Sequence, residues 1–118
     1  MEKHHFSDCD AQDVEVQAKD VKIRWLITEK MGANTFVMRH FEIAPGGYTP
    51  RHAHEWEHEV YILSGAGSVL GNGRENAFKA GDAIFMPGGE DHQFKNTGDA
   101  PVTMLCLIPA RKSECLLP

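Results

Sequence analysis

The chain has 118 residues, of which 42% are hydrophobic and 25% are charged, and these are ordinary values for one globular domain. Its net charge of −5 offers no basic surface to nucleic acid or an anionic membrane, and no apolar run approaches the roughly 18 residues that a membrane-spanning helix needs. The three cysteines, Cys9, Cys106 and Cys115, are an odd number at scattered positions, so we expect no disulfide framework and a cytoplasmic protein.

The first nineteen residues are polar and of mixed charge. We interpret residues 1–19 as a loosely held N-terminal arm that can gain a strand against a partner subunit. We expect one domain over residues 20–110 and a short C-terminal tail at residues 111–118. The arm contains two histidines and one cysteine that could bind a metal but at a chain terminus are better explained as part of a mobile tail: His4, His5 and Cys9.

Short runs of alternating apolar and polar residues follow the arm, separated by turns rich in Gly, Pro and Asn. The clearest turn is Gly71-Asn72-Gly73, because an Asn-Gly pair between short strands is a strong hairpin signal. No stretch shows a helical period of useful length. We therefore predict an all-β, antiparallel sandwich or barrel with strands near 21–27, 35–43, 52–54, 58–63, 68–70, 74–78, 83–86, 92–96 and 102–108.

The second expected strand, at residues 35–43, carries a prediction about side-chain direction. Its alternation places Phe36, Met38 and His40 on one face and Arg39 on the other. We expect the strand to end at 44–47, Ala-Pro-Gly-Gly, because Pro supplies no backbone donor and Gly tolerates positive φ.

Histidines are concentrated in one stretch of the chain. His52, His54 and His58 lie within seven residues and share one parity, and His92 follows in a Pro-Gly-Gly-Glu-Asp-His sequence. Side chains two apart on an extended strand point to the same face, so two neighbouring strands would bring these imidazoles together. Imidazole suits zinc, copper, iron or nickel, and manganese binds in mixed nitrogen and oxygen sites. The pattern therefore predicts a mononuclear metal site.

The spacing of these residues resembles the two motifs of the cupin superfamily. The second motif, G(X)5PXG(X)2H(X)3N, fits at every fixed position, with Gly81, Pro87, Gly89, His92 and Asn96. The first motif begins equally well, with Gly46, His52 and His54. The motifs and the strands around them cover roughly residues 35–108. This resemblance to small single-domain cupins implies a double-stranded β-helix, or jelly-roll barrel, with a metal inside one end, and it also implies a homodimer.

The first motif departs from the family pattern at its glutamate. The three-residue gap after His54 and the six-residue spacer before Gly65 both put His58 at that position, whereas Glu59 fits only a four-residue gap. Glu59 also has the opposite parity. The chain therefore resembles the cupin variants that bind metal through four imidazoles, here His52, His54, His58 and His92, with Glu59 as the alternative third ligand.

Such a site would have a particular chemistry. Four neutral imidazoles leave the dipositive charge of the ion uncompensated, and four ligands on an octahedral ion leave two positions open. We therefore expect a small anionic or chelating oxygen ligand. Manganese or iron is favoured by cellular availability and by the resemblance, and zinc, nickel and copper are the alternatives. Glu57 and Glu59 are candidates for orienting imidazole N–H groups. An equally good interpretation is that both are simply exposed carboxylates on a turn.

We expect an apolar pocket around the ion, although methionine and phenylalanine at strand period are more often plain core. Its candidates are Phe36, Met38, His40, Phe94, Met104 and Cys106. The leading functional hypothesis is a metal-dependent oxidoreductase of the dioxygenase type acting on a small oxygenated molecule. The alternatives are a metal-dependent isomerase or decarboxylase that uses the ion as a Lewis acid, and a non-catalytic small-molecule-binding protein. No catalytic side chain is assigned.

Overall fold

The computed structural model describes residues 1–110, so the C-terminal tail expected at 111–118 lies outside the described residues. Within these limits the chain forms strands and two short 3₁₀ helices, η1 and η2. Their bounds are η1 Phe6–Asp8, β1 Gln12–Val14, β2 Lys19–Ile27, η2 Glu29–Met31, β3 Phe36–Tyr48, β4 His58–Ser64, β5 Ala66–Gly71, β6 Arg74–Lys79, β7 Ala83–Met86, β8 Gln93–Lys95 and β9 Val102–Pro109.

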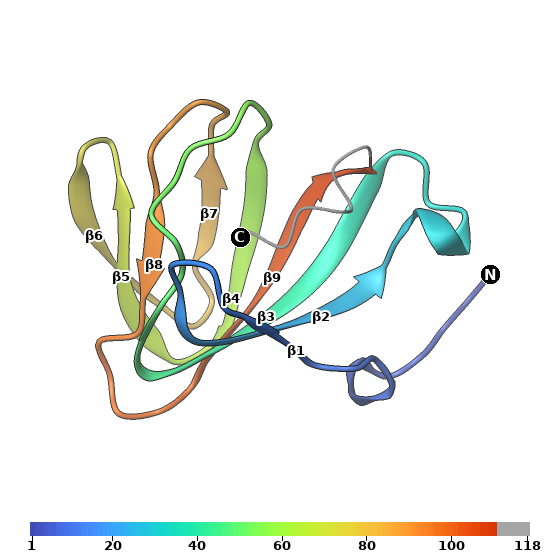
Figure 1. The fold of residues 1–118 in the computed structure, drawn as a ribbon, viewed down its shortest axis with the longest axis horizontal. Helices are drawn as coiled ribbons and strands as arrows, with labels where there is room; N and C mark the ends of the chain where they lie inside the picture. Colours follow the sequence, from blue (N-terminus) through green and yellow to red (C-terminus); the bar gives the residue numbers. More distant parts are fainter. Residues whose placement is uncertain (111–118) are drawn as a thin grey trace.

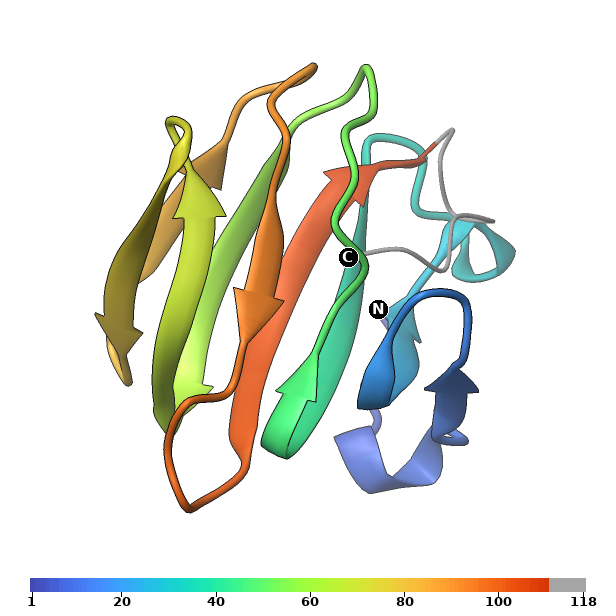
Figure 2. The same ribbon diagram turned by 60° about the vertical axis from the view of Figure 1, so that its left-hand side comes forward.

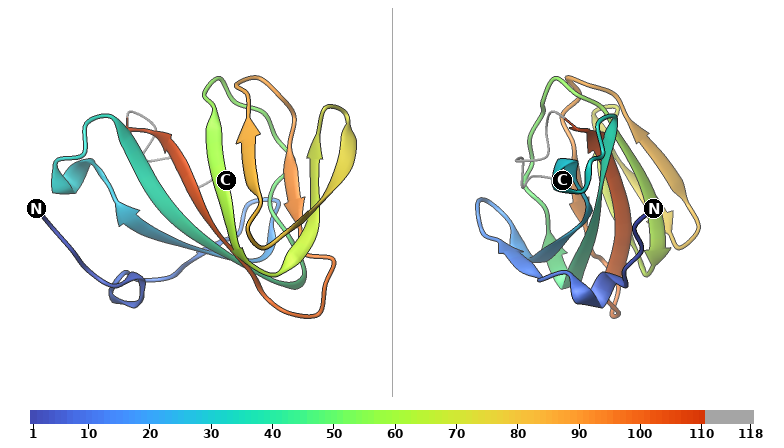
Figure 3. Two further views of the ribbon diagram at one scale, coloured as in Figure 1. Left: turned by 180° about the vertical axis from the view of Figure 1, so that it is seen from behind. Right: turned by 90° about the vertical axis from the view of Figure 1, so that its right-hand side faces the viewer.

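All described strands belong to one antiparallel sheet that curls on itself. The main path runs β6-β5-β8-β3-β9-β4-β7, and β2 and β1 extend the sheet beside β3. Figure 1 shows β2, β3 and β9 forming one wall and β5, β6 and β8 forming the other. Figure 3 shows the same curled sheet from behind and from one side. The fold is the predicted all-β jelly-roll barrel. Within the described residues, no helix is long and apolar enough to cross a membrane.

The core lies between the two walls and follows the period of two that strands impose. In β9 every second side chain is buried at 2% exposure or less: Val102, Met104, Cys106 and Ile108. In β4, likewise, His58, Val60 and Ile62 point inward, whereas Glu59 and Tyr61 point out. The histidine that begins β4 therefore belongs to the buried set.

The prediction that the second strand ends at residues 44–47 is wrong, because β3 continues through them to Tyr48. The strand bends there and changes neighbours: it pairs with β9 as far as Ile43 and with β8 at Tyr48. Gly46 takes a φ of 80°, and a Cβ on Gly47 would lie 2.6 Å from the Lys19 carbonyl oxygen. The Pro-Gly-Gly sequence thus allows a bend without breaking the strand. Figure 2 shows β3 between β2 and β9.

Residues 52–54 do not form the expected strand. They make a single isolated bridge, in which His52 and His92 are paired antiparallel. The two backbone N–H groups donate to the opposite carbonyl oxygens at 3.1 and 2.9 Å. On the outside, the Arg51 guanidinium donates to the Asp91 carboxylate at 2.8 Å. This short link suffices to place His52 and His92 opposite each other.

The N-terminal arm is anchored to its own chain. Its strand β1 pairs with β2, and the Arg24 guanidinium donates to the Cys9 carbonyl at 2.5 Å. The Phe6 ring stacks on His40, with ring centroids 5.1 Å apart. The sequence reasoning expected a loosely held arm, whereas these contacts hold residues 6–14 of the arm against the barrel. Strand β2 begins at Lys19, one residue before the predicted start of the domain at residue 20. The division into arm and domain remains a prediction.

Candidate metal centre

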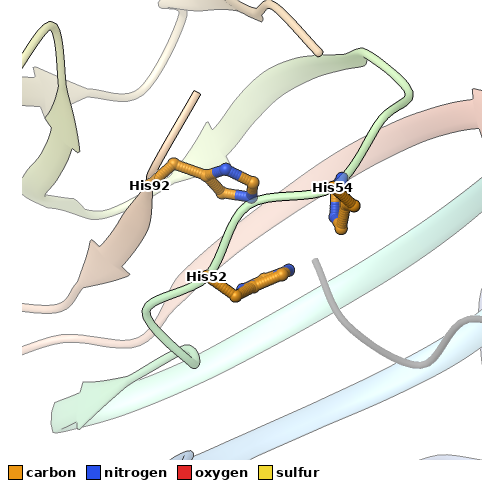
Figure 4. A group of neighbouring side chains, drawn as sticks. All are labelled: His52, His54 and His92. Atoms are coloured by element: carbon orange, nitrogen blue, oxygen red, sulfur yellow. The ribbon is translucent and has the colours of Figure 1, made fainter. Parts of the chain in front are cut away.

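Four histidines from separate segments converge at one end of the barrel. His52 and His54 lie between β3 and β4, His58 begins β4, and His92 comes directly before β8. Ligand atoms of His52, His54 and His92 lie within 4.8 Å of one another. Figure 4 shows these three rings turned toward a common point from two segments of the chain.

His58 joins this cluster from the buried side. Its Nε2 atom lies 2.8 Å from Nε2 of His54, and its ring centroid lies 5.1 Å from that of His92. The side chain is only 2% exposed. The structure thus brings together all four histidines that the sequence singled out.

The outer nitrogen of each ring, Nδ1, is engaged. Three histidines hold Nδ1 against a backbone carbonyl oxygen: His52 against Pro50 at 2.9 Å, His92 against Glu90 at 3.0 Å and His54 against Trp56 at 3.4 Å. A carbonyl oxygen only accepts, so these contacts favour the hydrogen on Nδ1 and leave the lone pair of Nε2 for the centre of the cluster. Nδ1 of His58 instead lies 3.1 Å from the sulfur of Cys106.

Burial favours the neutral form of three rings in the cluster, those of His52, His54 and His58. Burial, and after it the neighbouring rings of His52 and His92, lowers the pKa of His54 to about 4. Burial, and after it the Arg39 guanidinium, lowers the pKa of His58 to about 2. The pKa of His52 is also lowered, chiefly by burial. At neutral pH these imidazoles therefore offer lone pairs to a metal rather than positive charge.

The residues present fit a divalent transition-metal ion. Two facing Nε2 atoms at 2.8 Å need a proton or a cation between them, and adjacent ligands of an octahedral ion with bonds of about 2.1 Å lie roughly 3 Å apart. Among the described residues, Nε2 of His52 is buried without a hydrogen-bond partner. An ion at the centre of the cluster would lie between the two facing Nε2 atoms and would also bind Nε2 of His52.

Trp56 supports the cluster and was missed by the sequence reasoning. Its ring lies parallel to that of His54, with centroids 4.1 Å apart and an interplanar angle of 8°. The stacked indole restricts the orientation of His54, whose contact at Nδ1 is the longest of the three carbonyl contacts. The signal available in the sequence was an aromatic residue, Trp56, two positions after the candidate ligand His54.

The alternative ligand Glu59 lies elsewhere. It is exposed on the outer face of β4, where it lines a shallow groove with Tyr61 and Phe85. Glu57 is exposed as well. The structure therefore brings His58, and not Glu59, to the other three histidines.

The six expected pocket residues fall into two groups. Phe94, Met104 and Cys106 are buried inside the barrel at 1% exposure or less. Phe36, Met38 and His40 lie on the outer face of β3, where Phe36 is 58% exposed. This second group does not line the histidine cluster, so that part of the prediction is corrected. The alternating set that faces inward is instead Val37, Arg39, Phe41 and Ile43.

Arg39 is the principal inward residue that the sequence reasoning placed on the wrong face. It is completely buried, and its Nη2 donates to the Cys106 sulfur at 3.1 Å. The same atom lies 3.4 Å from Nδ1 of His58. The sequence did contain a signal for this inward position: Arg39 is a single charged residue in an otherwise apolar alternating set, Val37-x-Arg39-x-Phe41.

An antiparallel barrel with a histidine cluster at one end is the arrangement that the sequence motifs implied, and comparison with known proteins agrees. The family model of the cupin domain, Cupin_2, matches residues 39–108. The chain belongs to this cupin family.

Relatives and solved structures of the family bear different names. The structure of the polyketide cyclase RemF from Streptomyces resistomycificus is 38% identical, with a TM-score of 0.87 over 93% of this chain and 80% of that one. An oxalate-binding protein of Thermotoga maritima is 36% identical over 70% of this chain and 69% of its own length. A 1-methylthio-D-xylulose 5-phosphate methylsulfurylase of Rhodospirillum rubrum is 32% identical over 69% of this chain. The chain spans 52% of the length of the methylsulfurylase.

Proposed function

We propose that this protein is a metal-dependent cupin in which four histidines hold one divalent transition-metal ion. The observation that carries the proposal is the facing pair of Nε2 atoms on His54 and His58. Beside this pair lie the ring of His92 and Nε2 of His52, which has no hydrogen-bond partner within residues 1–110. Manganese or iron is the preferred ion on grounds of cellular availability. Zinc, nickel and copper remain alternatives, because imidazole binds them well.

The proposed ligand of this centre is a small anionic or chelating oxygen compound. Four neutral imidazoles leave the ion's charge uncompensated, and an octahedral ion would keep two positions for the ligand. The likeness to a protein named for binding oxalate supports this class, because oxalate is a dianion with two chelating oxygen atoms. The role of the four side chains is to hold the ion, while their burial limits the access of water.

Two reaction types fit such a site. In the first, the ion acts as a Lewis acid on the bound oxygen compound, as an isomerase, decarboxylase or cyclase would require. The names of two relatives, a polyketide cyclase and an oxalate-binding protein, favour this type or simple binding. In the second, the protein is an oxidoreductase of the dioxygenase type, for which a redox-active ion with two open positions could take substrate and O₂ together.

The test of the metal site is the metal content of protein purified without an affinity tag, measured by mass spectrometry. We expect near-stoichiometric manganese or iron in the wild type and in Glu59→Ala, and loss of metal in His58→Ala. Glu59→Ala is the matched control, because Glu59 is next to His58 but points to the outer face. Loss of metal in Glu59→Ala alone would reject the four-histidine set. A wild type that takes up no metal even after reconstitution would reject the proposal altogether.

The ligand class and the reaction type are tested on metal-loaded protein. Oxalate titrated calorimetrically should bind the loaded protein and not the metal-free protein. Turnover of candidate oxygen compounds should then be compared with and without O₂. Equal turnover under both conditions supports the Lewis-acid type, and turnover that requires O₂ supports the dioxygenase type.

We also propose that the protein is a homodimer in a reducing, cytoplasmic setting. The outer faces of β4 and β7 carry exposed apolar side chains, with Tyr61 at 47%, Leu63 at 43% and Phe85 at 58% exposure. Tyr61 and Phe85 line a groove of ≈ 320 Å³. A second copy of the chain would cover this face. Cys9 and Cys106 are free thiols, which fits a reducing compartment.

A further inference from the structure

We propose that Cys106 is a positioning residue that fixes the tautomer of His58, with Arg39 as the second donor to the same sulfur. In this arrangement Nδ1 of His58 carries the hydrogen and Nε2 presents its lone pair to the metal. The inference rests on the proposed metal site, and it assigns to the buried pair Arg39 and Cys106 a role that differs from core packing.

His58 differs from the other three histidines in what holds its outer nitrogen. The other rings use backbone carbonyl oxygens, which can only accept a hydrogen bond. Nδ1 of His58 faces two side-chain atoms, the Cys106 sulfur at 3.1 Å and Nη2 of Arg39 at 3.4 Å. His58, Arg39 and Cys106 are each 2% exposed or less, so bulk water cannot readily replace either neighbour.

The two neighbours differ in the hydrogen bonds that they can make with the ring. A guanidinium group only donates, so a hydrogen bond from Arg39 to Nδ1 would require the ring hydrogen to be on Nε2, and Nε2 could not then bind an ion. The thiol sulfur can accept from both Arg39 and Nδ1, and it also carries one hydrogen of its own. Arg39 lies closer to the sulfur, at 3.1 Å, than to Nδ1, at 3.4 Å. We infer that the sulfur accepts the arginine's hydrogen and that Nδ1 of His58 also donates to the sulfur.

The sheet register explains why these three side chains meet. Arg39 on β3 is the direct partner of Cys106 on β9, and Cys106 is in turn the partner of Val60 on β4. His58 lies two residues before Val60 and shares its inward face. Three adjacent strands thus place a donor, an acceptor and the candidate ligand in one row of contacts.

The first test uses metal-free protein with ¹⁵N-labelled histidine, in which long-range ¹H–¹⁵N NMR spectra distinguish the two tautomers. His58→Gln identifies the signal. We expect the Nδ1–H tautomer of His58 in the wild type and in Cys106→Ser, which keeps an acceptor, and the Nε2–H tautomer in Cys106→Ala. In the metal-free wild type the hydrogen between the two facing Nε2 atoms is then carried by His54, whose contact at Nδ1 is the longest of the three carbonyl contacts. Adding Arg39→Met to Cys106→Ala removes the competing donor and should restore part of the Nδ1–H tautomer. An Nε2–H tautomer in the wild type, or no change in Cys106→Ala, would overturn the proposal.

The second test measures metal affinity and the surroundings of the bound ion. Loss of this outer hydrogen bond should weaken binding about 10- to 100-fold in Cys106→Ala, in the range for partners that orient metal ligands. Cys106→Ser should bind within a few-fold of the wild type. Pulsed EPR of the Cu²⁺-loaded protein reports the outer nitrogens of bound imidazoles, and one of them should change in Cys106→Ala.

Ile108→Val is the control for packing, because Ile108 is buried on the same face of β9 two residues away. An equal loss of affinity in Ile108→Val would show that only packing matters and would overturn the positioning role. A wild type that binds no metal would instead reject the proposed function, and the NMR result on metal-free protein would still decide the role of Cys106.

Discussion

At the scale of residues, the site depends on which nitrogen of each imidazole faces inward. Backbone carbonyl oxygens near Nδ1 favour one choice for His52, His54 and His92, and we infer that the Cys106 sulfur favours the same choice for His58. Because burial also lowers the pKa of His54 and of His58, the rings resist protonation that would compete with a metal.

The lowered pKa values predict that the metal-free protein loses stability as the pH falls from 6.5. In the unfolded chain these histidines take up protons near pH 6.5, whereas in the folded chain the pKa of His54 is about 4 and that of His58 about 2. The unfolded state then binds more protons, so the free energy of unfolding decreases as the pH falls through this window. Urea unfolding at pH 7.5, 6.0 and 5.0 measures the effect before most carboxylates titrate.

His58→Gln provides the comparison for this pH dependence, since it removes the most strongly shifted of these groups. Its unfolding free energy should change less between pH 7.5 and 5.0 than that of the wild type. Identical slopes for the two proteins would show that His58 is not buried as a neutral ring.

The sequence was sufficient to predict the convergence of the four histidines but not the direction of the residues on β3. The histidines carry strong spacing and parity signals, which local geometry converts into position. On β3, both alternating sets contain apolar residues, so parity could not decide between them. The deciding contact is the stacking of Phe6 on His40, which covers the outer face from more than thirty residues away in the chain.

At the scale of elements, the bend of β3 connects the two walls of the barrel and leads the chain toward the histidine segment. Gly47 is buried there between the carbonyl oxygens of Lys19 and Ala44, where a Cβ would lie 2.6 and 2.9 Å from these backbone atoms. Because backbone atoms cannot move aside cheaply, Gly47→Ala should lower the free energy of unfolding by about 1–3 kcal/mol, as overpacking does. Urea unfolding monitored by circular dichroism checks this value.

Gly98→Ala is the matched control for the bend. Gly98 is exposed, and an added Cβ would make only ordinary contacts at 3.5 and 3.6 Å. We expect a change within about 0.5 kcal/mol. Equal destabilisation by the two substitutions would mean that the close approach at Gly47 does not limit the bend.

The elements that could be predicted from sequence are those fixed by local turn chemistry. The hairpin at Asn72-Gly73 formed as expected, with both residues at positive φ, as a tight turn between two strands requires. The continuation of β3 and the single bridge at His52 could not be predicted in the same way. Both depend on partners far along the chain, namely β8 and His92.

At the scale of the whole molecule, the curled sheet buries one face around the core and the histidines and leaves the other face open. Across β4 and β7 this outer face carries the exposed apolar side chains Tyr61, Leu63 and Phe85, together with the exposed Glu59 that pairs with Phe85 in the register. Large exposed apolar side chains grouped on one face of a sheet are typical of surfaces that associate.

If a second copy covers this face, the mass in solution should be twice the 13.2 kDa of the chain. Light scattering coupled to size exclusion measures that mass. Phe85→Glu places a charge in the centre of the proposed interface and should yield monomers, because an unpaired carboxylate is costly to bury. Val16→Glu is the control, since Val16 is 70% exposed and lies in the arm. A monomeric wild type would reject the dimer, and dissociation by Val16→Glu alone would assign the interface to the arm.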